Sequence, residues 1–344
     1  MQSTRSGPHD TPPEPRRAAV VYNPIKTDVG RLRAAVAAAA AAAGWAESLW
    51  FETSVDDPGQ RVTRQALRHG VDLVLAAGGD GTVRAVAESL RAAEVPLGIV
   101  PVGTGNLLAR NLQLPLNNLG EAIGIAFTGV SRPIDLGVAS VTFPDDRIED
   151  HVFLVMAGLG LDAQMIAATR PDLKKQVGWL AYVDAGMRAL PKAEQFRIRY
   201  NLGTRNEHQA TVSTILIANC GVLPGNIQFL PEAVIDDGIL DIAVLQPKGV
   251  LGWFKIWRRV TWQNGVLRRT SVGRRIIELT STEGERAMTT LVGSDIRIVP
   301  DTPQEFELDG NELGPVRSVF ARTDARALLV RVPAGQGSVS GRLS

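Results

Sequence analysis

The sequence has a single cysteine, Cys220, in 344 residues, so an intramolecular disulfide is excluded. Cys220 lies in an apolar stretch and is predicted to be a small core residue rather than a catalytic thiol. No apolar run reaches the roughly 18 to 20 residues that a membrane-spanning helix needs. The first residues also lack the apolar segment of a secretory signal peptide, and we therefore expect a cytoplasmic protein. The four histidines show no spacing typical of metal ligands.

An excess of charge of one sign is also absent, because 37 Lys and Arg residues balance 36 Asp and Glu residues to a formal net charge of +1. This balance gives no overall attraction to nucleic acid, and we expect no nucleic-acid partner. Contact with an anionic surface would need a local basic patch. The hydrophobic content of 44% is ample for buried cores, and the length favours two domains.

Two glycine turns are the most informative feature that is present. They read Gly-Gly-Asp-Gly-Thr at residues 78–82 and Gly-Thr-Gly-Asn at residues 103–106. Each follows an apolar, strand-like run and precedes a helical pattern. At such a junction, free backbone N–H groups and the positive end of a helix dipole favour a bound phosphate. The Walker and dinucleotide-binding spacings are absent from both turns, so a different phosphate-binding family is indicated. A tight turn that merely needs glycine is the alternative explanation.

The two turns and the loop after the first predicted strand supply the candidate nucleotide-binding residues. Their N–H groups and hydroxyls can cradle phosphate, their amides can orient ribose or phosphate, and a lysine can neutralise charge. The candidates are Asn23, Lys26, Gly78, Gly79, Asp80, Gly81, Thr82, Gly103, Thr104, Gly105 and Asn106. Lys26 is equally well explained as an exposed loop lysine. Asp80 is the first candidate ligand for Mg²⁺, which takes only one or two carboxylates in phosphate sites.

The secondary-structure pattern changes near the middle of the chain. Residues 17–137 alternate strand-like and helical segments, which predicts an α/β nucleotide-binding domain with a layered sheet. Residues 138–333 consist mostly of short strands with one helix at 173–190, which predicts a second, mainly antiparallel β-sandwich domain for the substrate. The ends, 1–16 and 334–344, are predicted to be disordered tails. A ligand is expected in the cleft between the two lobes.

Several motifs, taken in order, resemble the diacylglycerol kinase catalytic domain superfamily, and in particular its soluble bacterial diacylglycerol and sphingosine kinase-like members. The resemblance rests on Asn23-Pro24, residues 78–82, 101–112, 134–137, 157–163, 236–241 and 308–310. It implies a fold like that of NAD kinase and diacylglycerol kinase, in which an α/β lobe is joined to a β-sandwich lobe. It further implies ATP and Mg²⁺ as cofactors and transfer of the γ-phosphoryl group to a lipid hydroxyl.

The resemblance also implies a cation site in the second lobe. In this family a structural cation binds at an aspartate-glycine turn, which here corresponds to Asp237 with main-chain oxygens near Val234 and Ile239. A simple hairpin turn explains the same dipeptide, because Asp-Gly is a standard turn sequence.

The family pattern ends in an Asp-Gly-Glu triplet, whose acidic groups are implied to contact the acceptor hydroxyl. Here the triplet begins at Asp309, but Asn311 stands at the glutamate position and Glu312 follows. Asp309 is therefore implied as the base, because an amide cannot usefully accept a proton. Either Glu312 shifts into place, Asp309 acts alone, or catalysis is weakened.

A lipid kinase must reach its substrate at a membrane surface, so peripheral membrane association is expected. Trp253, Ile256, Trp257 and Val260 recur at helical spacing beside basic residues. This helix either lies in the membrane interface or packs its apolar side on the β lobe. The rival enzyme is NAD kinase, which shares the first glycine turn, and the rival from another class is a nucleotide- or lipid-binding protein that has lost catalysis. The lipid acceptor and the oligomeric state, a homodimer included, stay open.

Overall fold

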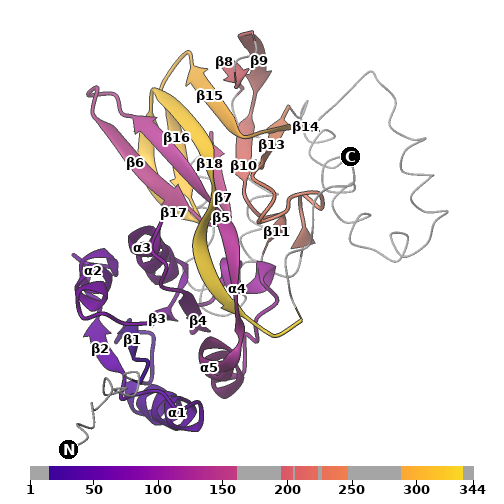
Figure 1. The fold of residues 1–344 in the computed structure, drawn as a ribbon. Coiled ribbons are helices and arrows are strands. Elements are labelled where there is room, and N and C mark those ends of the chain that lie inside the picture. The colour runs from indigo at the N-terminus through magenta and orange to yellow at the C-terminus, as the bar shows by residue number, and fades with distance from the viewer. Residues whose placement is uncertain (1–14, 161–194, 204–205, 224–226, 247–287, 336–344) are drawn as a thin grey trace, which may run out of the picture.

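The computed structural model describes residues 15–160, 195–203, 206–223, 227–246 and 288–335. These residues form a ten-stranded sheet, a six-stranded sheet and a two-stranded one, with the helices gathered at one end (Figure 1). No helix among them is long and apolar enough to cross a membrane.

The N-terminal part contains four parallel strands and five helices. The strands are β1 (Ala18–Tyr22), β2 (Leu49–Glu52), β3 (Leu73–Gly78) and β4 (Leu97–Pro101), which pair in the order β2-β1-β3-β4. The helices are α1 (Val29–Ala42), α2 (Gln60–Arg68), α3 (Asp80–Leu90), α4 (Leu107–Asn111) and α5 (Leu119–Thr128). Parallel strands need crossover connections, usually helical, and the predicted α/β alternation is confirmed.

Local sequence explains where these elements begin. The Asp28 side chain accepts a hydrogen bond from the N–H of Arg31 at 3.0 Å and caps α1, and the Asn118 side chain caps α5 in the same way. The alanine-rich sequence of α1 suits a helix because alanine has the highest helix propensity. All residues of β1 and β3 are buried, as expected for parallel strands covered on both faces.

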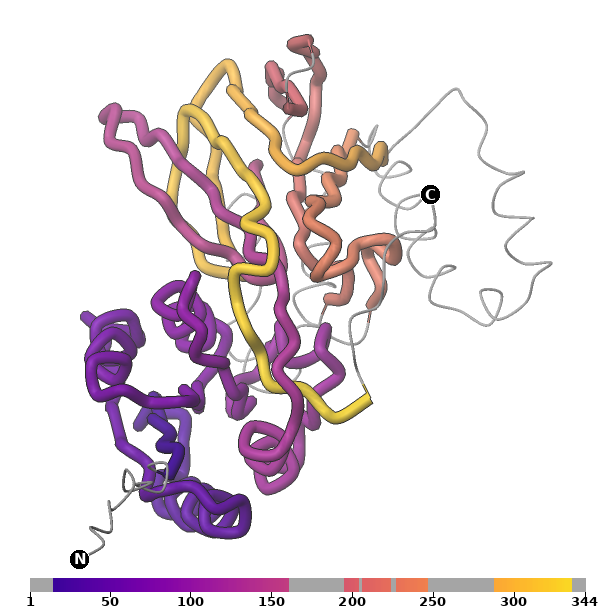
Figure 2. The backbone as a smooth tube through the Cα atoms, viewed as in Figure 1, coloured from indigo at the N-terminus to yellow at the C-terminus, as the bar shows by residue number. Residues whose placement is uncertain are grey.

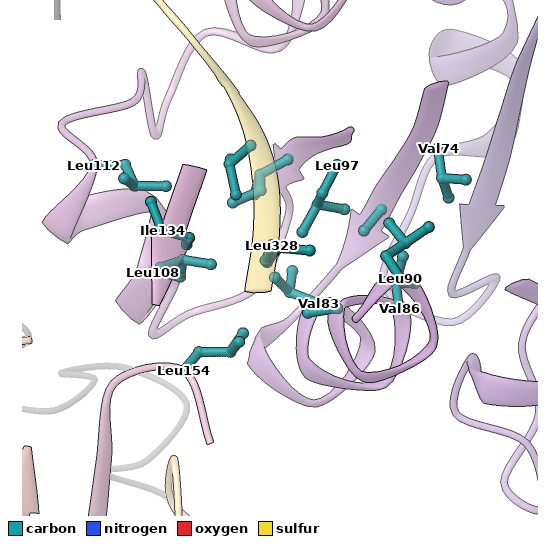
Figure 3. Packing of buried hydrophobic residues seen from close by; sticks show 14 of the residues in the cluster. Val74, Val83, Val86, Leu90, Leu97, Leu108, Leu112, Ile134, Leu154 and Leu328 are labelled. Atoms are coloured by element: carbon teal, nitrogen blue, oxygen red, sulfur yellow. The ribbon is translucent and has the colours of Figure 1, made fainter. Parts of the chain in front are cut away.

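Helix α3, which follows the first glycine turn, is fixed by hydrophobic packing. Val83, Val86 and Leu90 lie on the side of α3 that faces Leu97 and Leu328 (Figure 3). All of these side chains belong to one buried cluster. The start of α3 is therefore held in place against the sheet, which gives the preceding turn a fixed position.

The second part of the described chain is a sandwich of two sheets. Strands β5 (Val130–Thr142), β6 (Ile148–Phe153), β8 (Phe196–Leu202), β9 (His208–Val212), β15 (Asp295–Pro300) and β18 (Ser318–Val332) belong to the ten-stranded sheet. The six-stranded sheet is formed by β14 (Met288–Gly293), β13 (Leu240–Leu245), β10 (Thr214–Ala218), β7 (Met156–Leu159), β16 (Gln304–Leu308) and β17 (Asn311–Val316). The short pair comprises β11 (Val222–Leu223) and β12 (Ile227–Gln228). Buried residues from both large sheets form one core, which includes Phe153, Ile215, Ile242, Ile298 and Phe306.

Strand β18 joins the two parts. It pairs in parallel with β4 through Val330 and Leu97, and antiparallel with β5 along most of its length. Figure 2 shows the C-terminal segment running beside β5 from the upper sandwich down to the helical end. One continuous sheet therefore spans the α/β part and part of the sandwich.

The predicted fold class, an α/β lobe followed by a mainly antiparallel β lobe, is confirmed. The boundary predicted between residues 137 and 138 falls within β5, and the division into domains stays a prediction. The predicted helix at 173–190 and the tryptophan-containing helix at 253–260 lie outside the described residues.

Candidate functional site

The first glycine turn connects β3 to α3 at the carboxyl end of the parallel strands. Gly79 is the N-cap residue of α3 and its carbonyl accepts from the N–H of Val83. A side chain at Gly78 would put its Cβ 2.4 Å from the Cβ of Thr82, so only glycine allows Thr82 to pack there. Thr82 is buried. The turn presents its backbone at a helix start, the geometry that binds anions.

The second turn lies directly against the first. A Cβ on Gly103 would be only 2.6 Å from the Cα of Gly79, so the two backbones are in contact. The Asn106 side chain accepts from the N–H of Gly103 at 3.1 Å and donates to its carbonyl at 2.8 Å. The amide of Asn106, a predicted ribose or phosphate contact, is thus occupied in shaping its own turn. Thr104 is exposed at the apex.

Asp80 ties the two turns together. Its carboxylate accepts from the backbone N–H groups of Asn106, at 3.0 Å, and Leu107. Burial raises the pKa of Asp80, while these N–H groups and the Lys26 ammonium oppose the rise. A Cβ on Gly105 would meet this carboxylate at 2.5 Å, which explains the glycine at that position.

The loop after β1 brings a cation to the same place. The Asn23 side chain accepts from the N–H groups of Ile25 and Lys26, at 3.0 and 3.3 Å, and so shapes the loop. The Lys26 ammonium would lie 3.1 Å from a Cβ on Gly79. The predicted phosphate-binding lysine therefore lies at the first glycine turn.

Asp309 is held by a row of three backbone donors. Its carboxylate accepts from the N–H groups of Leu154, Val155 and Met156 at 2.8, 2.9 and 3.0 Å. Burial raises the pKa of Asp309, and these N–H groups together with the Arg84 guanidinium oppose the rise. One oxygen accepts two of the three hydrogen bonds and the other accepts one, so the carboxylate keeps room for another donor.

The turn that carries Asp309 meets the start of α3. Arg84 donates to the carbonyl of Leu308 at 2.9 Å, and the Asn311 amide nitrogen lies 3.7 Å from where a Cβ on Gly81 would stand. The structure thus brings the predicted base beside the first glycine turn, although the two are more than 200 residues apart in sequence.

Two further acids lie next to this turn. Glu307 of β16 is opposite Glu312 of β17, where the pairing register shifts between Phe306 and Glu307. Burial, followed by the charges of Glu312 and Asp309, raises the pKa of Glu307 to about 7. Glu312 therefore lies opposite the half-buried Glu307, whereas Asn311 pairs with Leu308.

Two family models match the chain in succession. The diacylglycerol kinase catalytic domain matches residues 17–139, and the YegS C-terminal NAD kinase beta sandwich-like domain matches residues 155–330, about half of the chain. The chain belongs to the diacylglycerol kinase catalytic domain family. The glycine turns lie within the first match, and Asp309 lies within the second.

Individual relatives agree with this family. A "Probable lipid kinase YegS-like" of Pseudomonas fluorescens is 32% identical over 246 residues, which cover 70% of this chain and 77% of that protein. A "Diacylglycerol kinase" of Bacillus subtilis is 27% identical, with the same two coverages. A "Probable lipid kinase YegS-like" of Pseudomonas putida is 34% identical over 197 residues, and the chain spans 62% of its length. A crystal structure of a diacylglycerol kinase from Bacillus anthracis shares the fold, with a TM-score of 0.63 at 18% identity over 93% of this chain and 98% of that one.

The metal-ligand candidates of this diacylglycerol kinase family member fall in two places. Asp80 lies between the glycine turns, whereas Asp237 lies in a turn where its carboxylate accepts from the N–H of Ile239 at 3.1 Å. The side chain of Asp135, a residue of β5, accepts a hydrogen bond from the N–H of Gly238 and so holds that turn against β5. Among the described residues, no group of three or more acidic, histidine or cysteine side chains could hold a metal ion. The second-lobe cation site, with Val234, stays a prediction.

Sequence reasoning missed two parts of the site. Arg84 follows the first turn by two residues, and this closeness in sequence could have indicated a cation at the phosphate site. The donors of Leu154–Met156 are backbone groups, for which no residue type gives a signal.

Proposed function

We propose that the protein is an ATP-dependent lipid kinase that phosphorylates a hydroxyl group of a diacylglycerol-like or sphingoid lipid at a membrane surface. The observation that carries this proposal is the contact between the two glycine turns, with both Lys26 and the Asp309 turn beside the first of them. Phosphoryl transfer needs mainly positioning and charge neutralisation, with a base near the acceptor. These residues supply each of those requirements in one place.

The proposed roles follow the geometry. The N–H groups of the turns and the Lys26 ammonium bind the phosphates of ATP. Asp309 accepts the proton of the lipid hydroxyl as that oxygen forms its bond to the γ-phosphorus, the bond from phosphorus to the β–γ bridging oxygen breaks, and ADP leaves. The open hydrogen-bonding capacity of the Asp309 carboxylate supports this role.

Asp80 fits a magnesium ion, since its carboxylate accepts from the N–H groups of Asn106 and Leu107 through different oxygens and each carboxylate oxygen has two lone pairs. When bound, Mg²⁺ neutralises polyphosphate charge, with nucleotide oxygens and water as its other ligands. The absence of a three-residue acidic cluster among the described residues is compatible with this arrangement.

The test of the Asp309 role is the Asp309→Asn variant. Lipid-dependent turnover should be lost, whereas ATP affinity measured by calorimetry should be nearly unchanged, because the carboxylate lies on the acceptor side of the turns. Asparagine keeps the size of the side chain and one of its two acceptor oxygens. Full activity in this variant would remove Asp309 from the mechanism.

A second candidate function has a specific observation in its favour. Asn311, which replaces the glutamate implied by the family pattern, lies beside Gly81, and an amide there cannot act as a base. Under this alternative the protein binds nucleotide or lipid without transferring phosphate. Measurable ATP affinity without turnover on any acceptor would support it.

A further inference from the structure

Arg84 occupies the junction between the nucleotide turns and the acceptor side of the site. It is the fifth residue of α3, two residues beyond Thr82, and its Nη1 donates to the carbonyl of Leu308 at 2.9 Å. The next residue after Leu308 is Asp309. One side chain therefore connects the helix that starts at the first glycine turn with the strand that ends at the predicted base.

The guanidinium has donors to spare at this position. Arginine carries five N–H groups, and within the described part of the chain Arg84 uses one of them, on the Leu308 carbonyl. No described carboxylate forms a salt bridge with it, although Asp309 is close enough for their charges to interact. Arg84 is half-buried, and its backbone contact limits where the guanidinium can move.

The surrounding charges define what such a cation can bind. Lys26 lies at Gly79 in the first turn, and Arg84 lies at Leu308, the residue before Asp309. During phosphoryl transfer, negative charge is spread over the three equatorial oxygens of the moving group. A planar guanidinium with several parallel donors matches such oxygens better than a point charge does.

We propose that Arg84 is a catalytic residue that binds the γ-phosphoryl group of ATP and stabilises it during transfer to the acceptor. The proposal rests on the proposed kinase function. In the reaction the bond from the γ-phosphorus to the β–γ bridging oxygen breaks, a bond to the acceptor oxygen forms, and the acceptor proton passes to Asp309. Arg84 keeps its proton throughout and acts only by its charge and hydrogen bonds.

The experiment compares Arg84→Ala with Arg64→Ala, a matched control that removes an exposed arginine from the neighbouring helix α2. Calorimetry gives the affinities for ATP and for ADP, and a lipid-phosphorylation assay gives kcat. For Arg84→Ala we expect kcat to fall about 100- to 1,000-fold and ATP affinity to fall about tenfold or more, while ADP affinity stays within about twofold. Added guanidinium ion should restore part of the activity. Arg64→Ala should match the wild type in every measurement.

The outcomes separate binding from a structural role. Equal losses of ATP and ADP affinity, or an unchanged kcat, would overturn the proposal, because Arg84 would then only shape the turn or contribute nothing. Thermal unfolding checks the fold, and Arg84→Met, which keeps the aliphatic stem, replaces the alanine variant if that variant unfolds. If the wild type phosphorylates no lipid, the kinase function fails, but the ATP-to-ADP affinity ratio still decides the role of Arg84. A ratio lowered by the substitution supports γ-phosphate binding, and an unaltered ratio refutes it.

Discussion

Replacing Glu307 with glutamine should change how the stability of the protein depends on pH. Burial and the neighbouring acids Glu312 and Asp309 raise the pKa of Glu307 from an ordinary 4.5 to about 7. Because the folded state holds the proton more tightly than the unfolded chain, the stabilisation from the protonated acid is complete below about pH 4.5. It is lost as the pH rises through 7.

The expected size of the stability difference follows from the shift in the pKa of Glu307. A change from 4.5 to about 7 corresponds to at most about 3 kcal/mol. Since Glu307 is half-buried and solvent screens its neighbours, we expect about 1–2 kcal/mol. Glu307→Gln, which cannot ionise, should therefore be more stable than the wild type by that amount at pH 8 and should lose this advantage at pH 5.

Urea unfolding at pH 5, 6, 7 and 8 gives the free energy of unfolding of the variant and of the wild type. In the difference between the two values, the titration of all other groups cancels. Glu94→Gln, which makes the same chemical change at an exposed position, serves as the control and should show no pH-dependent difference. The reasoning would be refuted if Glu307→Gln were less stable than the wild type at pH 8, or if the difference did not vary with pH.

Three other substitutions test the site and its support. Gly103→Ala places a methyl group 2.6 Å from the backbone of the first turn, so ATP affinity by calorimetry should fall about tenfold or more. The control Gly124→Ala, with open space around the new Cβ, should leave ATP affinity unchanged. Equal ATP affinities of the two variants would contradict the contact between the turns. Arg132→Ala leaves the buried Asp236 carboxylate without its cation, so the free energy of unfolding in urea should fall by about 3–5 kcal/mol, and a loss below about 1 kcal/mol would argue against this pairing. Asp80→Ala removes the acceptor for two N–H groups of the second turn, so both the Tm and the ATP affinity should drop. A variant with wild-type values for both would show that the link between the turns is dispensable.

The parallel sheet and its glycine turns could be predicted because their signals are local. Each strand is a short apolar run, α1 and α5 have side-chain caps, and the glycines mark the junctions. The carboxyl ends of neighbouring parallel strands meet at one edge, so the placement of Lys26 beside Gly79 agrees with the predicted cradle.

The rest of the site depends on contacts between distant segments, which a single sequence does not reveal. The pairing of β18 with β4 and β5 depends on the register of strands far apart in the chain. The N–H groups that hold Asp309 come from residues 154–156 and carry no side-chain signature. The pairing of Glu312 with Glu307, next to a register shift, is likewise a property of the folded hairpin. Whether Glu312 takes the place of the family glutamate stays a prediction.

The most direct test of the account is transfer of labelled γ-phosphate from ATP with Mg²⁺ to a panel of lipids in mixed micelles. The panel contains diacylglycerol, monoacylglycerol, sphingosine, ceramide and phosphatidylglycerol, with NAD in a parallel tube and Asp309→Asn as the inactive control. The account predicts label on at least one lipid, none on NAD, and none with the variant. Label on NAD would contradict the choice of acceptor, and ATP binding without transfer to any acceptor would contradict the proposed catalysis.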